Sequence, residues 1–136
     1  MDRIEIYSAT NTEDQSLSFS DFKIGNIKLA PHLGVSDEIS SLDVNGSFAK
    51  QLLLQDYSDL KSGRVPLYVC ICCADLGCGA TTVLVEDLGN KIKWSEFGRE
   101  SNLQHGLFQN DYMKRTGPFY FDKTEYLSAI NPYASK

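Results

Sequence analysis

The sequence lacks several features that would place the protein at a membrane or on nucleic acid. It has no run approaching the roughly 18 apolar residues that a membrane span needs. Its N-terminus, MDRIEIYSATNTEDQ, is polar and acidic, unlike a signal peptide. With 18 acidic and 13 basic residues the net charge is −5, so the basic excess typical of a nucleic-acid-binding protein is missing. These absences predict a cytoplasmic protein that contacts neither a membrane nor nucleic acid directly.

Sequence motifs of well-known catalytic sites are also missing. There is no G-x-G-x-x-G, G-K-[ST], H-E-x-x-H or G-x-S-x-G, and the chain has only two histidines. The pattern therefore favours a protein that is not an enzyme and has no resident cofactor.

What is present is typical of one globular domain over residues 1–136. The hydrophobic content is 42% and the charged content 23%, and the length is sufficient to bury a core without staples. Aromatic residues make up 11% of the chain, which argues against disorder.

Three consecutive segments have the periodicity of strands. VPLYVCICC (65–73) is almost wholly apolar and predicts a central strand, and ATTVLVED (80–87) predicts the next. In KIKWSEF (91–97), Ile92 and Trp94 alternate with polar residues, so Trp94 is expected in the core. The short links predict an antiparallel meander over 65–97.

Two segments predict helices. Apolar residues recur at helical spacing over 48–60, where Ser47 is expected to cap the start. Asp122 is expected to cap a second helix over 123–130. The fold class is therefore α+β, an antiparallel sheet containing the 65–97 meander with two helices packed on it. Residues 98–117 are expected to form a long loop that can include one helical turn.

All four cysteines lie within nine positions, at 70–78. Cys70, Cys73 and Cys78 resemble half of a zinc ribbon, but the second C-x-x-C of such a site is missing. No helix follows to activate a thiol for redox chemistry. We favour a structural role, in which the cysteines fill a buried strand and its bend. The alternative is a small zinc- or thiol-dependent enzyme that uses these three residues.

Acidic residues are the candidate partner-binding residues. An acidic surface suits a basic protein partner, because complementary fields speed encounter. The candidates are Asp56, Asp59, Glu86, Asp87, Glu96 and Glu100.

The motifs of the C-terminal half resemble those of a family of small uncharacterised bacterial proteins. That family has a strand ending in C-x-x-C, the string D-x-G-C-G, a W-x-x-F segment and a closing G-P-F-x-F-D helix. The matching positions are Cys70, Cys73, Asp75, Gly77, Cys78, Gly79, Trp94, Phe97, Gly117, Pro118 and Phe119. The resemblance implies a fold and a bacterial origin, and it implies no reaction.

In size and acidity the chain is also similar to immunity proteins of contact-dependent growth inhibition systems. That likeness implies tight blocking of a cognate toxin, often a basic nuclease, by occlusion. The expected function is therefore that of a cytoplasmic immunity protein.

If the cysteines are structural, Cys73→Ser and Cys78→Ser will each lower the free energy of unfolding by about 1 kcal/mol and leave function intact. Urea denaturation measures the first effect. Elemental analysis of the purified protein tests the alternative, which would be supported by about one equivalent of zinc retained after chelation.

Overall fold

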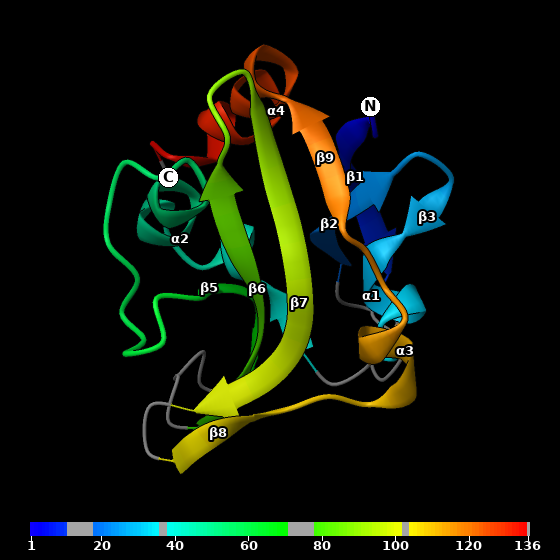
Figure 1. Cartoon of the computed structure of the whole chain (residues 1–136), viewed down its shortest axis with the longest axis vertical. Coiled ribbons are helices and arrows are strands. Elements are labelled where there is room, and N and C mark those ends of the chain that lie inside the picture. The colour runs from blue at the N-terminus through cyan, green and yellow to red at the C-terminus, as the bar shows by residue number, and fades with distance from the viewer. Residues whose placement is uncertain (11–17, 36–37, 71–77, 102–103, 136) are drawn as a thin grey trace.

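The fold comes from a computed structural model that describes residues 1–10, 18–35, 38–70, 78–101 and 104–135 (Figure 1). Its strands are β1 Ile4–Thr10, β2 Ser18–Ile24, β3 Ile27–Lys28, β4 Glu38–Ser40, β5 Val65–Cys70, β6 Ala80–Asp87, β7 Lys91–Ser101, β8 Gln104–Phe108 and β9 Phe119–Asp122. Its helices are α1 Leu29–His32, α2 Gly46–Leu52, α3 Asp111–Lys114 and α4 Lys123–Ile130, with short 3-10 helices η1 Ser41–Asp43 and η3 Asn131–Tyr133. No helix in these residues has the length and apolar composition of a membrane span.

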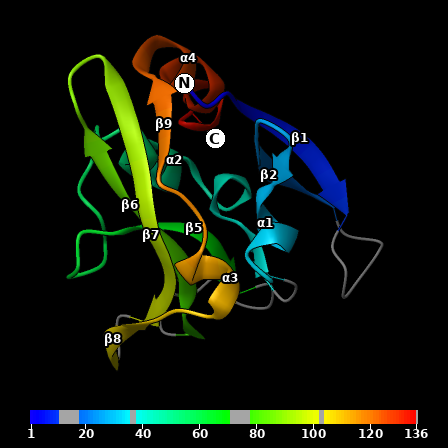
Figure 2. The same cartoon turned by 45° about the vertical axis from the view of Figure 1, so that its right-hand side comes forward.

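The strands form two antiparallel sheets. One has the order β4-β5-β6-β7-β8, with β9 beside β7, and the other has the order β1-β2-β3. In Figure 2 the two sheets stand on opposite sides of the molecule, and α4 lies across the end where both termini are found. The predicted α+β class and the antiparallel meander of β5, β6 and β7 are confirmed.

The two predicted helices agree with the structure to different degrees. Helix α4 covers the predicted residues 123–130, and the Asp122 carboxylate accepts a hydrogen bond from the Glu125 amide at 3.0 Å, as expected of an N-cap. Helix α2 ends at Leu52 instead of residue 60, and Asn45 caps it instead of Ser47. The described chain contains four helices where two were expected.

A local motif stops α2 early. Leu54 has a φ of 59°, in the left-handed region, and its amide donates to the Gln51 carbonyl at 3.1 Å. The Gln55 amide donates to the Lys50 carbonyl at 2.9 Å. These two bonds make a Schellman motif, which satisfies the last carbonyls of the helix. A leucine in this conformation costs about 1 kcal/mol. Because the turn falls on a leucine and not on a glycine, the sequence gives no sign that the helix ends here.

The segment 98–117 is more regular than expected. It contains the end of β7, the edge strand β8 and the helix α3. Asn110 caps α3 by accepting from the Met113 amide at 2.8 Å, and its own amide donates to the Leu33 carbonyl at 3.0 Å. Contacts with a distant segment thus order a stretch that has no periodicity of its own.

Trp94 lies at the centre of the core, as the sequence predicted, and is fully buried. Its ring makes edge contacts with Phe22 of the smaller sheet at 5.4 Å and with Phe121 at 5.3 Å between ring centroids. The indole Nε1–H donates to the Tyr126 hydroxyl at 3.1 Å, and that hydroxyl donates to the Leu52 carbonyl at 2.6 Å. One chain of hydrogen bonds therefore joins β7, α4 and α2 inside the core.

Replacing Tyr126 with Phe tests this chain. The variant leaves the Trp94 N–H and the Leu52 carbonyl buried without partners, and each such group costs about 1–3 kcal/mol. We expect the free energy of unfolding to fall by at least about 2 kcal/mol in urea titrations. Tyr120→Phe, at a half-buried tyrosine of β9, is the control and should change it little. Equal effects of the two variants would contradict this account.

Candidate protein-binding site

Two of the six candidate acids lie in the irregular segment between α2 and β5, residues 53–64, which we name the 53–64 loop. Asp56 and Asp59 are both exposed, and Tyr57 between them has 93% of its surface exposed. Leu54 of the same loop is 43% exposed. The loop therefore presents Leu54, Tyr57 and two carboxylates to solvent, with one lysine, Lys61.

Glu86 and Asp87 lie at the end of β6 and are engaged by lysines. The Glu86 carboxylate lies 4.0 Å from Lys93 Nζ, and the Asp87 carboxylate lies 2.8 Å from Lys123 Nζ. The hydrogen bond from Lys123 lowers the pKa of the Asp87 carboxyl. Both pairs are at the surface, where such pairs contribute little to stability.

Glu96 is exposed at an irregular point of β7. It has a φ of 54°, where one extra residue is inserted in β7 relative to β6. Glu96 and Glu86 line a cavity of about 390 Å³ together with Lys93 and Lys114. The charge around this cavity is mixed, so it is not an acidic surface.

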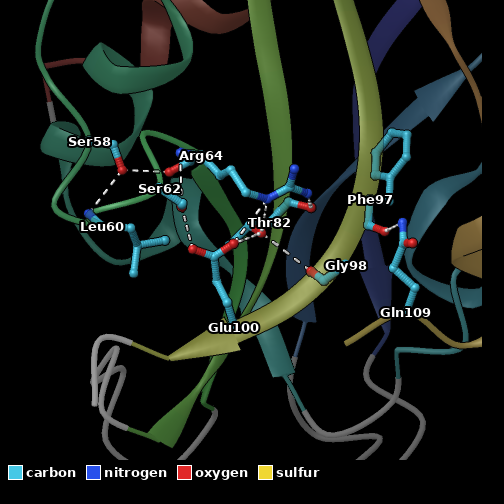
Figure 3. Close-up of polar contacts among 9 residues, drawn as sticks. All are labelled: Ser58, Leu60, Ser62, Arg64, Thr82, Phe97, Gly98, Glu100 and Gln109. Atoms are coloured by element: carbon cyan, nitrogen blue, oxygen red, sulfur yellow. Dashed lines mark hydrogen bonds and ion pairs between the residues drawn. The ribbon is translucent and has the colours of Figure 1, made fainter. Parts of the chain in front are cut away.

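Glu100 differs from the other candidates because its side chain is buried. Only 8% of it is exposed, and its carboxylate lies 2.9 Å from Nε of Arg64, whose side chain is 9% exposed. The Thr82 hydroxyl donates to the same carboxylate at 3.0 Å (Figure 3). The Glu100 side chain therefore contacts the protein interior and is not presented to a partner.

The Arg64 guanidinium is held by groups of the sheet. Its Nε lies 3.1 Å from the Thr82 hydroxyl, and its Nη2 donates to the Thr82 carbonyl at 3.4 Å. Burial lowers the pKa of the Arg64 guanidinium, and the charge of Glu100 opposes that effect. The pair is thus a buried ion pair with further hydrogen bonds around it.

The same group of residues fastens the 53–64 loop to the sheet (Figure 3). The Ser62 hydroxyl donates to Glu100 and accepts from the Arg64 amide at 3.3 Å. The Ser58 hydroxyl donates to the Arg64 carbonyl and accepts from the Leu60 amide at 3.0 Å. Leu60 is buried in a cluster with Phe48, Val69 and Ala80. The C-terminal half of the loop is therefore tethered by both polar and apolar contacts.

Sequence reasoning missed most of this site. Tyr57 is one of the residues that give 48–60 its apolar helical spacing, so its exposure was not expected. Arg64, Ser58 and Ser62 were not singled out. The available signal was Arg64 itself, a charge directly before an almost wholly apolar strand, since a charge that is buried with such a strand requires a partner.

The cysteine cluster is described only in part. Cys70 is half-buried at the end of β5 and Cys78 is exposed before β6. Cys73, and the residues Asp75 and Gly77 of the family pattern, lie outside the described residues. Within those residues no group of three His, Cys, Asp or Glu side chains is arranged to hold a metal ion. The structural role and the zinc alternative both stay predictions.

Comparison with protein families, with curated proteins and with solved structures finds no match to this chain. The resemblance to the small bacterial family therefore also stays a prediction.

Glu100→Gln tests the role of the buried pair. The variant leaves the Arg64 guanidinium buried without its counter-charge, which costs about 3–5 kcal/mol. We expect urea titrations to show a loss of this size, and hydrogen exchange to quicken in the 53–64 loop.

Two further variants complete this test. Arg64→Met combined with Glu100→Leu should cost less than Glu100→Gln alone, because no charge is then left buried. Lys123→Met, which breaks a surface pair with Asp87, should change stability by less than about 1 kcal/mol. If Glu100→Gln costs no more than Lys123→Met, the pair does not hold the loop.

Proposed function

We propose that this protein is a cytoplasmic immunity protein of bacterial origin, which binds a cognate basic toxin and blocks it by occlusion. The observation that carries the proposal is Tyr57, an aromatic side chain with 93% exposure on a tethered loop. Tyrosine is enriched among residues that dominate binding energy at protein interfaces.

The tether of the 53–64 loop supports this proposal on energetic grounds. Binding normally costs free energy because loops and side chains become ordered at the interface. Here Ser58, Ser62 and Arg64 already order the C-terminal half of the loop. Leu54 and Tyr57 therefore lie between two fixed points, the Schellman motif at the end of α2 and the tethered residues 58–64.

The exposed charged residues of the loop are two carboxylates and one cation, Lys61, and this acidic excess supports a basic partner. No described lysine, arginine or histidine lies within ion-pair distance of Asp56 or Asp59, whereas Glu86 and Asp87 are paired with lysines. Exposed carboxylates that have no ion-pair partner act mainly on the rate of association with a partner of opposite charge. We assign the steering role to Asp56 and Asp59, and a smaller contribution to Glu96, Glu86 and Asp87.

This mechanism needs no chemical step in the protein. Tyr57 and Leu54 would be buried against the partner, the two aspartates would face its basic residues, and the bulk of the domain would cover the toxin's site. A toxin that acts on nucleic acid carries the basic surface that such a site requires.

The binding test uses a toxin domain encoded beside the gene for this protein. Tyr57→Ala should raise Kd by at least about 30-fold, the effect of losing about 2 kcal/mol at a hot spot. Asp56→Asn with Asp59→Asn should lower the association rate and its dependence on salt, with a smaller effect on dissociation. Surface plasmon resonance measures both.

Tyr112→Ala is the matched control, because Tyr112 is also exposed (56%) but lies on α3, away from the loop. It should leave binding unchanged. The proposed function fails if the wild-type protein forms no complex with such a domain, and the proposed site fails if Tyr57→Ala and Tyr112→Ala bind equally well.

A further inference from the structure

A cavity of about 550 Å³ lies among β1, the start of β2, the β3–α1 segment and β4. Figure 1 places β3 and α1 on the right of the molecule and the 53–64 loop on the left, so the cavity is separate from the proposed binding loop. Its volume is in the range of small-molecule sites, which are about 300–1,000 Å³.

Apolar residues form the larger part of the cavity walls. Residues of three elements and of the segment after α1 contribute to them, and these residues are Ala9, Phe19, Ala30, Pro31 and Val35. Such walls provide burial for the body of an apolar or aromatic molecule, at about 25 cal/mol for each Å² of apolar surface removed from water.

Tyr7 forms a polar part of the wall, and a buried carboxylate holds its hydroxyl in place. Its hydroxyl donates to the fully buried Asp21 carboxylate at 3.2 Å. Asp21 also accepts from the Tyr68 hydroxyl and from the amides of Phe22 at 2.8 Å and Ala30 at 3.2 Å. Burial, with the charge of Asp21, raises the pKa of Tyr7 to about 12, so the phenol stays neutral.

The two charged residues that line the cavity differ. Glu38 is buried and compensated, because its carboxylate accepts from the Thr81 hydroxyl at 2.6 Å and lies 3.2 Å from Nη1 of Arg99. Lys28 is exposed, and its Nζ lies 5.7 Å from the centre of the Tyr7 ring. No described carboxylate lies within ion-pair distance of Lys28. The rim therefore carries an uncompensated positive charge beside an apolar cavity.

We propose that this cavity binds a small organic anion with an apolar or aromatic body, whose carboxylate faces Lys28 and whose body lies against Phe19, Pro31 and Val35. A charge-assisted hydrogen bond to Lys28 selects the anion, and the apolar walls select its body.

The probes are 3-phenylpropionate and its neutral amide, titrated into the ¹⁵N-labelled full chain and followed by amide chemical shifts. We expect saturable shifts with the acid, confined to the segments that line the cavity (β1, the start of β2, and β3 through β4), and about tenfold weaker binding of the amide, since the charge-assisted bond is then lost. Lys28→Met should weaken binding of the acid by about the same factor and leave binding of the amide unchanged.

Two further variants sharpen the test. Lys50→Met, at an exposed lysine of α2, should bind the acid as the wild type does. Ala9→Phe should abolish binding of both probes by filling the cavity, with circular dichroism to verify that the variant folds. The proposal is overturned if the acid gives no saturable shifts, if acid and amide bind equally, or if Lys28→Met and Lys50→Met behave alike. Because no toxin is present, none of these results depends on the proposed function.

Discussion

The buried ion pair between Arg64 and Glu100 is the constraint on which the candidate binding surface depends. Removing two charges from water is costly, and the attraction between them repays that cost only when the remaining hydrogen-bonding groups are also satisfied. Thr82 and Ser62 supply those further bonds. The pair gives little net stability by this reasoning, and its main effect is to fix where the 53–64 loop leaves the sheet. A hydrophobic contact at the same point is not directional and would leave the path of the loop less well defined.

Much of the fold follows from local sequence patterns. The alternation in residues 91–97 and the apolar run at 65–73 correctly indicated the meander, because strand periodicity is a property of neighbouring residues. Asp122 was correctly predicted as a helix cap, because a cap also depends only on residues close together in the sequence. The early end of α2 was not predictable in this way, since the left-handed turn falls on Leu54, which carries no conformational signal of its own.

The candidate site was predictable only in part. Sequence reasoning selected Asp56 and Asp59 for their charge, and both are exposed. It grouped Glu100 with them, although Glu100 faces an arginine 36 positions earlier in the chain. Pairing across such a distance depends on strand register, which a single sequence does not reveal. The exposure of Tyr57 was not predictable either. Its aromatic ring is typical of a core residue, and only the early end of α2 places it outside the core.

The position of Trp94 has a practical consequence for spectroscopy. It is the only tryptophan in the chain and has no exposed surface. Its emission is therefore that of an indole in an apolar environment, and it reports on the joint between the two sheets and α4. Neither the 53–64 loop nor the cavity beside Lys28 contains a tryptophan. Intrinsic tryptophan fluorescence therefore follows global unfolding, and binding at either surface needs another label.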